Sequence, residues 1–146
     1  MSRVQLALNV SDVDAAVEFY TRLFGVGPAK RRPGYANFAL DEPALKLVLI
    51  ENPEAPATLN HLGVEVGSSG DVAAAQARLA GEGLQTATED GVSCCYALQD
   101  KVWVADPDGA PWEIYTVLAD SETMGRSAVG DDGDVCCAGS EVLSPG

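Results

Sequence analysis

Positive charge is scarce in this chain of 146 residues, because nine Lys and Arg stand against 22 Asp and Glu, giving a formal net charge of −13. Nucleic acids and anionic membrane surfaces attract basic proteins, so we expect neither as a partner. Long apolar runs are also missing, since none approaches the roughly 20 residues of a membrane-spanning helix. The chain enters a strand pattern at Val4 and shows no secretory signal. We therefore expect a cytoplasmic protein.

Cysteine is rare as well, and its four residues form two adjacent pairs, Cys94–Cys95 and Cys136–Cys137. In the cytoplasm these should be reduced thiols and not a disulfide framework. Hydrophobic residues make up 47% of the sequence. At this length they predict one compact domain with a substantial core.

Histidine occurs once, at His61. The surrounding segment 60–66 alternates apolar and other residues with period 2, which predicts a strand that carries His61 on the face opposite its apolar row. A lone histidine is commonly a hydrogen-bonded structural residue. By itself it does not define a functional site.

An internal repeat gives His61 a counterpart. A shift of 56 positions aligns the segment 5–10 with 61–66, and the glycines that end the two predicted helices then align without a gap. Gln5 and His61 occupy equivalent positions in this duplication. Because both side chains can bind a metal ion, their equivalence suggests a shared site.

Each half of the repeat has the pattern of a βαβββ module. In the first, we predict strands at 4–10, 29–32, 35–40 and 45–51, and a helix from an N-cap at Ser11 to a stop at Gly25. In the second, we predict a strand through His61, a helix at 71–80, and strands at 84–89, 95–105 and 112–118, with a possible break at 99–100. Turns are predicted at 33–34 and 106–109. The sequence thus predicts an α+β fold of paired βαβββ modules, with curved mixed sheets that form a metal-binding cleft.

The domain boundaries follow from composition. We expect a single domain at 1–118, divided into modules at about 1–54 and 55–118. The remaining segment, 119–146, is acidic, rich in Gly and Ser, and without periodicity, so we expect a disordered tail.

Glu113 completes the candidate metal site. If the two sheets face each other, Gln5, His61 and Glu113 converge as an amide oxygen, an imidazole nitrogen and a carboxylate. This donor set suits Fe(II), Mn(II), Ni(II) or Zn(II). Leu47 is expected near the equivalent position of the first module, which leaves three protein ligands and open positions on the metal. The alternative for Glu113 is an exposed acid at a strand end.

Several stretches, together with the turn before Glu113, make the chain resemble the vicinal-oxygen-chelate superfamily, which includes glyoxalases, extradiol dioxygenases and bleomycin-resistance proteins. Within it, the chain is similar to the organoarsenical carbon–arsenic lyase and cadmium-induced protein family. The resembling stretches are 4–8, 32–38, 45–49, 60–66, 94–96 and 99–104. Together they cover residues 1 to about 118.

The resemblance implies that Gln5, His61 and Glu113 bind Fe(II), that Cys94 and Cys95 bind arsenic, and that O2 is a co-substrate. The implied activity cleaves the carbon–arsenic bond of trivalent organoarsenicals, such as methylarsenite and aromatic arsenicals, and releases arsenite. Two thiolates would fill the two exchangeable positions of a monomethyl arsenic(III) centre, and soft thiolates favour such a centre over a harder metal. The expected partners are this small molecule and a second copy of the chain.

The adjacent cysteines pose a geometric problem. Neighbouring residues of a regular strand point to opposite faces, so two adjacent thiols cannot reach one atom there. The segment 91–93 before Cys94 predicts a loop or bulge that would solve this problem. The alternative is that Cys94 and Cys95 are two small buried apolar side chains.

Two other functions fit parts of the pattern. One is a thiol-based cadmium- or arsenite-binding stress protein without catalysis. The other is a glyoxalase-like isomerase, which would not need paired thiols.

Cys136–Cys137 is either an arsenic-delivery arm or tail sequence without a role, and Lys30–Arg32 is expected to be a solvated strand end. Five aromatic residues are candidates for pocket or core positions: Tyr35, Phe38, Tyr96, Trp103 and Tyr115.

Overall fold

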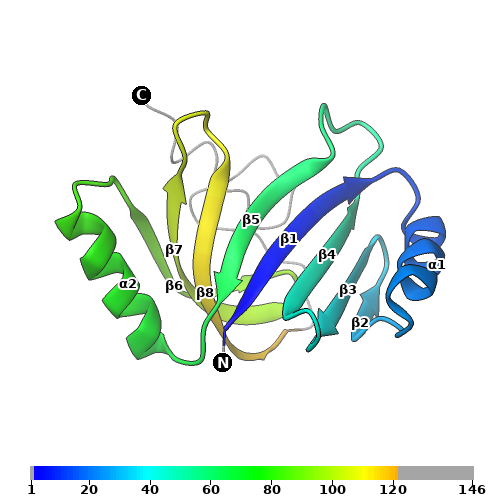
Figure 1. Cartoon of the computed structure of the whole chain (residues 1–146), viewed down its shortest axis with the longest axis horizontal. Coiled ribbons are helices and arrows are strands. Elements are labelled where there is room, and N and C mark those ends of the chain that lie inside the picture. Colours follow the sequence, from blue (N-terminus) through cyan, green and yellow to red (C-terminus); the bar gives the residue numbers. More distant parts are fainter. Residues whose placement is uncertain (1, 122–146) are drawn as a thin grey trace.

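The computed structural model describes residues 2–121. Its centre is one curved eight-stranded sheet in the order β2-β3-β4-β1-β5-β8-β7-β6, with helices α1 and α2 outside its two halves (Figure 1). The elements of the first half are β1 (Arg3–Val10), α1 (Val13–Phe24), β2 (Lys30–Arg32), β3 (Tyr35–Leu40) and β4 (Leu45–Glu51). Those of the second half are β5 (Leu59–Glu65), α2 (Ser69–Gly81), β6 (Ala87–Cys94), β7 (Ala97–Ala105) and β8 (Pro111–Asp120).

The strand pairing confirms two βαβββ modules in an α+β fold. β1 and β5 lie antiparallel at the centre of the sheet, where each module contributes its first strand. β1 then pairs in parallel with β4, and β5 pairs in parallel with β8. The two halves of the sheet therefore have equivalent strand orders on either side of the β1–β5 pair.

The N-cap of helix α1 lies one residue later than predicted. Asp12, not Ser11, is the N-cap, and its carboxylate accepts hydrogen bonds from the backbone N–H groups of Asp14 and Ala15. A carboxylate also interacts favourably with the helix dipole at this end. Gly25 ends the helix with φ 74°, in the left-handed region that glycine tolerates.

The largest boundary error concerns β6. We predicted a strand at 84–89, but β6 runs from Ala87 to Cys94, with a register shift between Glu89 and Val92 where Gly91 has φ 62°. Of the loop or bulge that we predicted at 91–93, the structure has a bulge at Gly91, which lets the strand continue. β7 is not broken at 99–100; the register with β8 shifts there instead.

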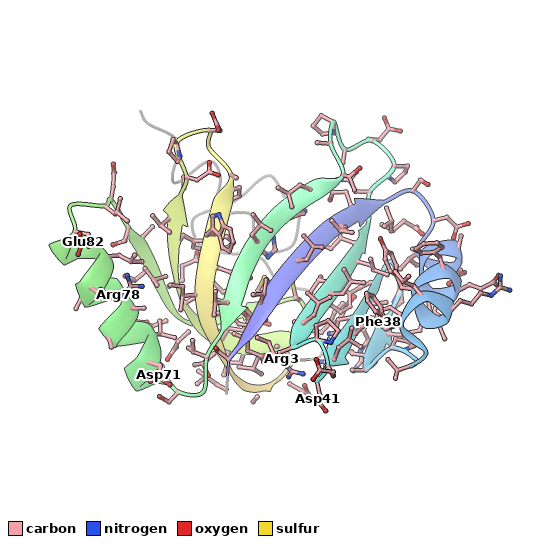
Figure 2. The ribbon with its side chains drawn as sticks, viewed as in Figure 1. Arg3, Phe38, Asp41, Asp71, Arg78 and Glu82 are labelled. Carbon is pink, nitrogen blue, oxygen red and sulfur yellow. The ribbon has the colours of Figure 1, made fainter. Side chains whose placement is uncertain are left out.

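The sheet has two differently packed faces. On one face, α1 covers an apolar cluster that includes Val17, Phe38 and Leu47 (Figure 2). The opposite face carries a second cluster, which includes Val48, Cys94 and Trp103. In residues 2–121, no helix is long and apolar enough to cross a membrane.

Candidate metal and thiol site

The three predicted metal ligands lie on adjacent strands at the centre of the sheet. Gln5 of β1 pairs in register with Gly63 of β5, and Gly63 pairs with Glu113 of β8. His61 lies two residues before Gly63 and therefore points to the same face. All three ligand side chains are buried, with exposed fractions of 4% for Gln5, 1% for His61 and 2% for Glu113.

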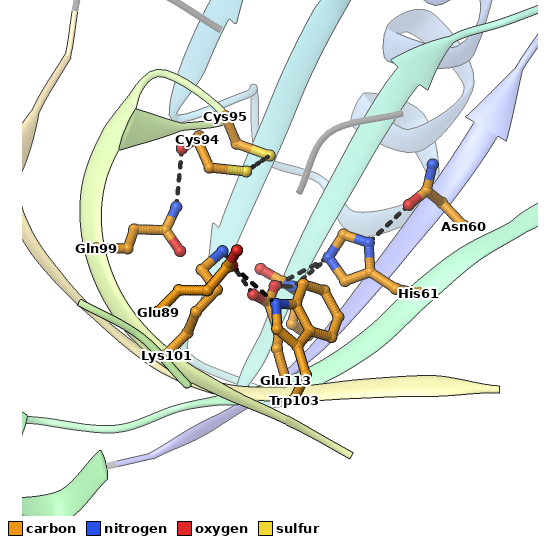
Figure 3. Close-up of polar contacts among 10 residues, drawn as sticks. Asn60, His61, Glu89, Cys94, Cys95, Gln99, Lys101, Trp103 and Glu113 are labelled. Atoms are coloured by element: carbon orange, nitrogen blue, oxygen red, sulfur yellow. Dashed lines mark hydrogen bonds and ion pairs between the residues drawn. The ribbon is translucent and has the colours of Figure 1, made fainter. Parts of the chain in front are cut away.

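Their polar atoms meet at one point (Figure 3). Gln5 Nε2 lies 3.0 Å from His61 Nε2 and 2.5 Å from Glu113 Oε2, and the last two atoms are 2.9 Å apart. Adjacent ligands of an octahedral metal ion lie roughly 3 Å apart when each bond is about 2.1 Å. The three side chains therefore have the spacing of one face of a metal coordination sphere.

Gly63 leaves the space that such a site needs. A Cβ atom at this position would lie 2.9 Å from Glu113 Cγ and 3.2 Å from Gln5 Nε2. Only glycine therefore allows Gln5 and Glu113 to approach across β5. The Gln5 amide nitrogen contacts both His61 Nε2 and Glu113 Oε2, and a turn of this amide would present Oε1 to a cation in its place. The donor set and the space both fit a metal ion.

The first module carries no equivalent carboxylate, although the position differs from the one we predicted. Val48 pairs with Ala7 as Glu113 pairs with Gly63, and Ala7 is the repeat counterpart of Gly63. Leu47, the expected counterpart of Glu113, lies in the α1 cluster on the other face. A shift of one residue in a strand reverses the face, which explains this error.

Lys101 is a site residue that the sequence reasoning missed. Its Nζ lies 2.8 Å from Glu113 Oε1, and the lysine side chain is 0% exposed. The contact is a buried ion pair. Within residues 2–121, neither atom has a hydrogen-bond partner in addition to it. Burial raises the pKa of Glu113, but Lys101 and then His61 outweigh it and lower the pKa from 4.5 to about 2. The sequence did contain a signal for Lys101, because it alternates in β7 with Gln99 and Trp103, which are both buried.

Trp103 holds the His61 ring from the side. The two rings meet edge to face, with centroids 5.4 Å apart. The indole Nε1–H of Trp103 donates to Glu89 Oε1 at 3.0 Å, and this contact is buried. The tryptophan therefore fixes one side of the imidazole.

Cys94 and Cys95 lie in a tight turn between β6 and β7. Cys94 pairs with Ala97, and the two residues between them, Cys95 and Tyr96, have φ values of 55° and 60°. This is the backbone of a type I′ hairpin turn, which usually contains Asn-Gly. The turn breaks the strand alternation, so both sulfurs point the same way (Figure 3). At 3.5 Å the two Sγ atoms are not bonded to each other. Both cysteines are nevertheless disulfide-bonded in this structure, so the expectation of reduced thiols is not met here.

Three side chains hold this turn. Lys30 Nζ donates to the carbonyl of Tyr96 at 2.9 Å, and Gln99 Nε2 donates to the carbonyl of Cys94 at 2.9 Å. The Arg32 guanidinium lies 5.6 Å from the centre of the Tyr96 ring. The prediction that Lys30–Arg32 is a solvated strand end was therefore wrong for Lys30 and Arg32, which reach across the cleft to the second module.

One cavity of about 200 Å³ connects the candidate metal ligands with the cysteine turn, because Gln5, Glu113 and Cys95 all line it. Tyr115 Oη and Gln99 Oε1 also border it, and neither atom has a hydrogen-bond partner in the described part of the chain. A larger open hollow of about 610 Å³ lies beside α1, but no predicted metal ligand or cysteine lines it.

The predicted aromatic residues divide between this cavity and the core. Tyr35 and Tyr115 line the cavity. Phe38 packs under α1 instead. Cys136, Cys137 and the rest of the predicted tail beyond residue 121 lie outside the described residues.

The model of the Glyoxalase/Bleomycin resistance protein/Dioxygenase superfamily matches residues 3–114. The chain belongs to this superfamily. Among its relatives, the cadmium-induced protein CadI of Mycobacterium tuberculosis is 62% identical over 144 residues, which cover 95% of each chain. The trivalent organoarsenical cleaving enzyme of Thermomonospora curvata is 54% identical over 147 residues, which cover 100% of this chain and 95% of that protein.

Solved structures of the superfamily show the same fold. An extradiol ring-cleaving dioxygenase from B. fuscum aligns with a TM-score of 0.61 and 22% identity, over 84% of this chain and 34% of that one. The Mn(II)-bound glyoxalase of Novosphingobium aromaticivorans aligns with a TM-score of 0.59 and 24% identity, over 83% and 42% of the two chains. At these identities, the likeness shows the fold alone.

Proposed function

We propose that this protein is a non-haem Fe(II)-dependent enzyme that uses O2 to cleave the carbon–arsenic bond of trivalent organoarsenicals and release arsenite. The observation that carries this proposal is the single cavity lined by both Cys95 and the candidate metal ligands Gln5 and Glu113. The relative from Thermomonospora curvata, a trivalent organoarsenical cleaving enzyme, supports the substrate class. We place the activity in the cytoplasm, where thiols stay reduced.

In their reduced form, Cys94 and Cys95 would bind the arsenic, which requires that their disulfides be reduced first. An organoarsenical RAs(OH)2 has two exchangeable hydroxyl groups, and two thiols (S–H) can replace both with release of two water molecules. The type I′ turn brings the two Sγ atoms to 3.5 Å, close enough to reach one atom. Because the turn borders the cavity, the carbon substituent would be directed into it.

Gln5, His61 and Glu113 would hold the metal on one face and leave its other positions open. Fe(II) with three such ligands supplies the activation of O2. Burial raises the pKa of Glu113, but Lys101 and His61 together lower it to about 2, so that the carboxylate is available as a ligand at neutral pH. Tyr115 Oη and Gln99 Oε1 provide a donor and an acceptor for polar atoms of the substrate in the cavity.

The overall reaction balances without a further reductant for the simplest substrate. CH3As(OH)2 and O2 together contain the atoms of As(OH)3 and formaldehyde, so O2 would take the two electron pairs lost by the methyl carbon and the As–C bond. Holding the arsenic and O2 in one cavity supplies proximity, which is worth up to about 7–11 kcal/mol for well-oriented reactants.

A second function is favoured by the name of the 62% identical relative, a cadmium-induced protein. A protein that only sequesters cadmium or arsenic would use the same thiols without turnover. To separate the two, purified protein loaded with Fe(II) is mixed with a hundredfold excess of methylarsenite in air, and arsenite is measured. An enzyme releases many equivalents per chain, whereas a sequestering protein releases at most one.

A further inference from the structure

His61 is hydrogen-bonded to its own neighbour in the chain. His61 Nδ1 lies 2.7 Å from Asn60 Oδ1 (Figure 3). Adjacent residues of a regular strand could not meet in this way. The β1–β5 register shifts at this point, because Ala7 pairs with His61 while Leu8 pairs with Leu59. Asn60 is therefore the extra residue of a β-bulge, and the bulge turns its side chain toward the imidazole.

A second asparagine continues the contact away from the site. Asn60 Nδ2 donates to Asn9 Oδ1 at 3.0 Å, and Asn9 Nδ2 donates to the backbone carbonyl of Ala57 at 3.0 Å. A carbonyl oxygen can only accept, so it fixes the orientation of the Asn9 amide. Asn9 Oδ1 then faces Asn60 Nδ2, which leaves Asn60 Oδ1 facing His61. Each hydrogen bond in this series thus fixes the orientation of the next amide.

We propose that Asn9 and Asn60 form an amide relay that places the proton of neutral His61 on Nδ1 and so leaves Nε2 free to bind the metal. Asn60 Oδ1 can only accept, and the hydrogen must therefore come from His61 Nδ1. On the other side of the ring, the Gln5 amide lies 3.0 Å from Nε2 and can donate to it. Glu113 Oε2 lies 2.9 Å from the same nitrogen and could accept a proton from it, but this oxygen already accepts from the Gln5 amide at 2.5 Å. Asn9 and Asn60 are thus positioning residues, and the inference rests on the metal site of the proposed function. Outer partners of metal-binding histidines typically change metal affinity by about 10–100-fold.

The single histidine makes the relay directly measurable. In metal-free protein at a pH well above the ordinary histidine pKa of about 6.5, the two imidazole ¹⁵N shifts come from His61 alone. We expect Nδ1 to be the protonated, pyrrole-type nitrogen and Nε2 the pyridine-type nitrogen. The reverse assignment in the wild-type protein would overturn the relay, and no variant needs to fold for this result.

Variants then test each link. Asn60→Leu should shift the tautomer toward Nε2–H and weaken Zn(II) binding, used as a diamagnetic probe, by about 10–100-fold. Asn60→Asp keeps the acceptor and should restore both properties. Asn9→Ala should shift the tautomer less, whereas Gln76→Ala on α2 should change neither property.

An unchanged tautomer in folded Asn60→Leu would contradict the relay. If the wild-type tautomer is as expected but Zn(II) does not bind, the proposed metal site fails and the relay stands.

Discussion

The hairpin turns of the two modules occupy equivalent places but differ in chemistry. In the first module, Pro33 and Gly34 join β2 to β3, and Gly34 takes φ 70° without strain. In the second, Cys95 and Tyr96 join β6 to β7, both with positive φ. The left-handed conformation costs a non-glycine residue about 1–2 kcal/mol. The second turn therefore departs from residue preference where the thiols must be presented, while the first follows it.

The metal site shows the same asymmetry. In the repeat, Gln5 is equivalent to His61 and Ala7 is equivalent to Gly63. Val48 pairs with Ala7 as Glu113 pairs with Gly63, so Val48 takes the place of Glu113 in the first module. The framework is duplicated, but the second module contributes the imidazole, the carboxylate and the glycine that leaves space for them. The candidate chemistry thus lies mainly in the second module, and the first provides Gln5 and two of the three side chains that hold the thiol turn, Lys30 and Arg32.

The largest expected effect comes from the counterpart pair Gln5 and His61. His61→Ala should reduce Fe(II) affinity more than a hundredfold, and Gln5→Ala should reduce it less, because a neutral amide is the weaker donor. Both affinities can be measured by anaerobic Fe(II) titration, with circular dichroism to check the fold. Equal affinities in wild type and His61→Ala would remove His61 from the metal site.

The two hairpin turns offer the next comparison. Cys94→Ser or Cys95→Ser should weaken the binding of a trivalent organoarsenical by about 100-fold or more, since the second As–S bond forms within one complex. Fe(II) binding should not change in either variant. Pro33→Ala, at the equivalent turn, is the matched control and should leave arsenical binding intact. Calorimetric titration measures both ligands, and full arsenical affinity in the serine variants would show that the turn is not the arsenic site.

Lys101→Met should destabilise the metal-free protein by about 3–5 kcal/mol at neutral pH, because it leaves the buried carboxylate of Glu113 without its partner. Lys101 lowers the folded-state pKa of Glu113, so its stabilising effect is present above pH 4.5 and lost as the pH falls through about 2. The difference in unfolding free energy between wild type and variant should therefore shrink across this range, as measured by urea unfolding. Lys101→Met with Glu113→Gln should recover much of the loss. A difference that does not depend on pH would contradict the ion pair.

The smallest expected effects come from substitutions at Gly63 and at Ala7, its equivalent in the repeat. Gly63→Ala should cost about 1–3 kcal/mol through overpacking and weaken Fe(II) binding, because the new Cβ would lie 2.9 Å from Glu113 Cγ. Ala7→Gly should change stability by about 1 kcal/mol and leave Fe(II) affinity unchanged. Fe(II) titration and urea unfolding of both variants test this, and equal metal affinity in the two would show that Gly63 has no special role.

Much of this arrangement could be predicted from the sequence. Alternation and the 56-residue repeat predicted the module order and the shared face of Gln5, His61 and Glu113, because both follow from local periodicity. Lys101 was missed because its role depends on pairing between β7 and β8, which sequence spacing does not reveal. The β-bulge at Asn60 was missed for the same reason.

The thiol turn was only partly predictable. The adjacent cysteines required a break in the strand, and we expected it at 91–93. The structure has a bulge at Gly91 but places the thiols in the turn that follows, at two residues without the usual turn chemistry. Residue preference could not locate this turn, since Cys95 and Tyr96 contradict it.

The most direct test of the account compares O2 consumption with product release. Fe(II)-loaded protein turning over methylarsenite in air should consume one O2 for each arsenite and each formaldehyde formed, over many turnovers, and should form neither product in strictly anaerobic buffer. Continued arsenite release without O2 would contradict an O2-dependent cleavage. Release that stops at one equivalent per chain, whether or not O2 is present, would contradict catalysis itself.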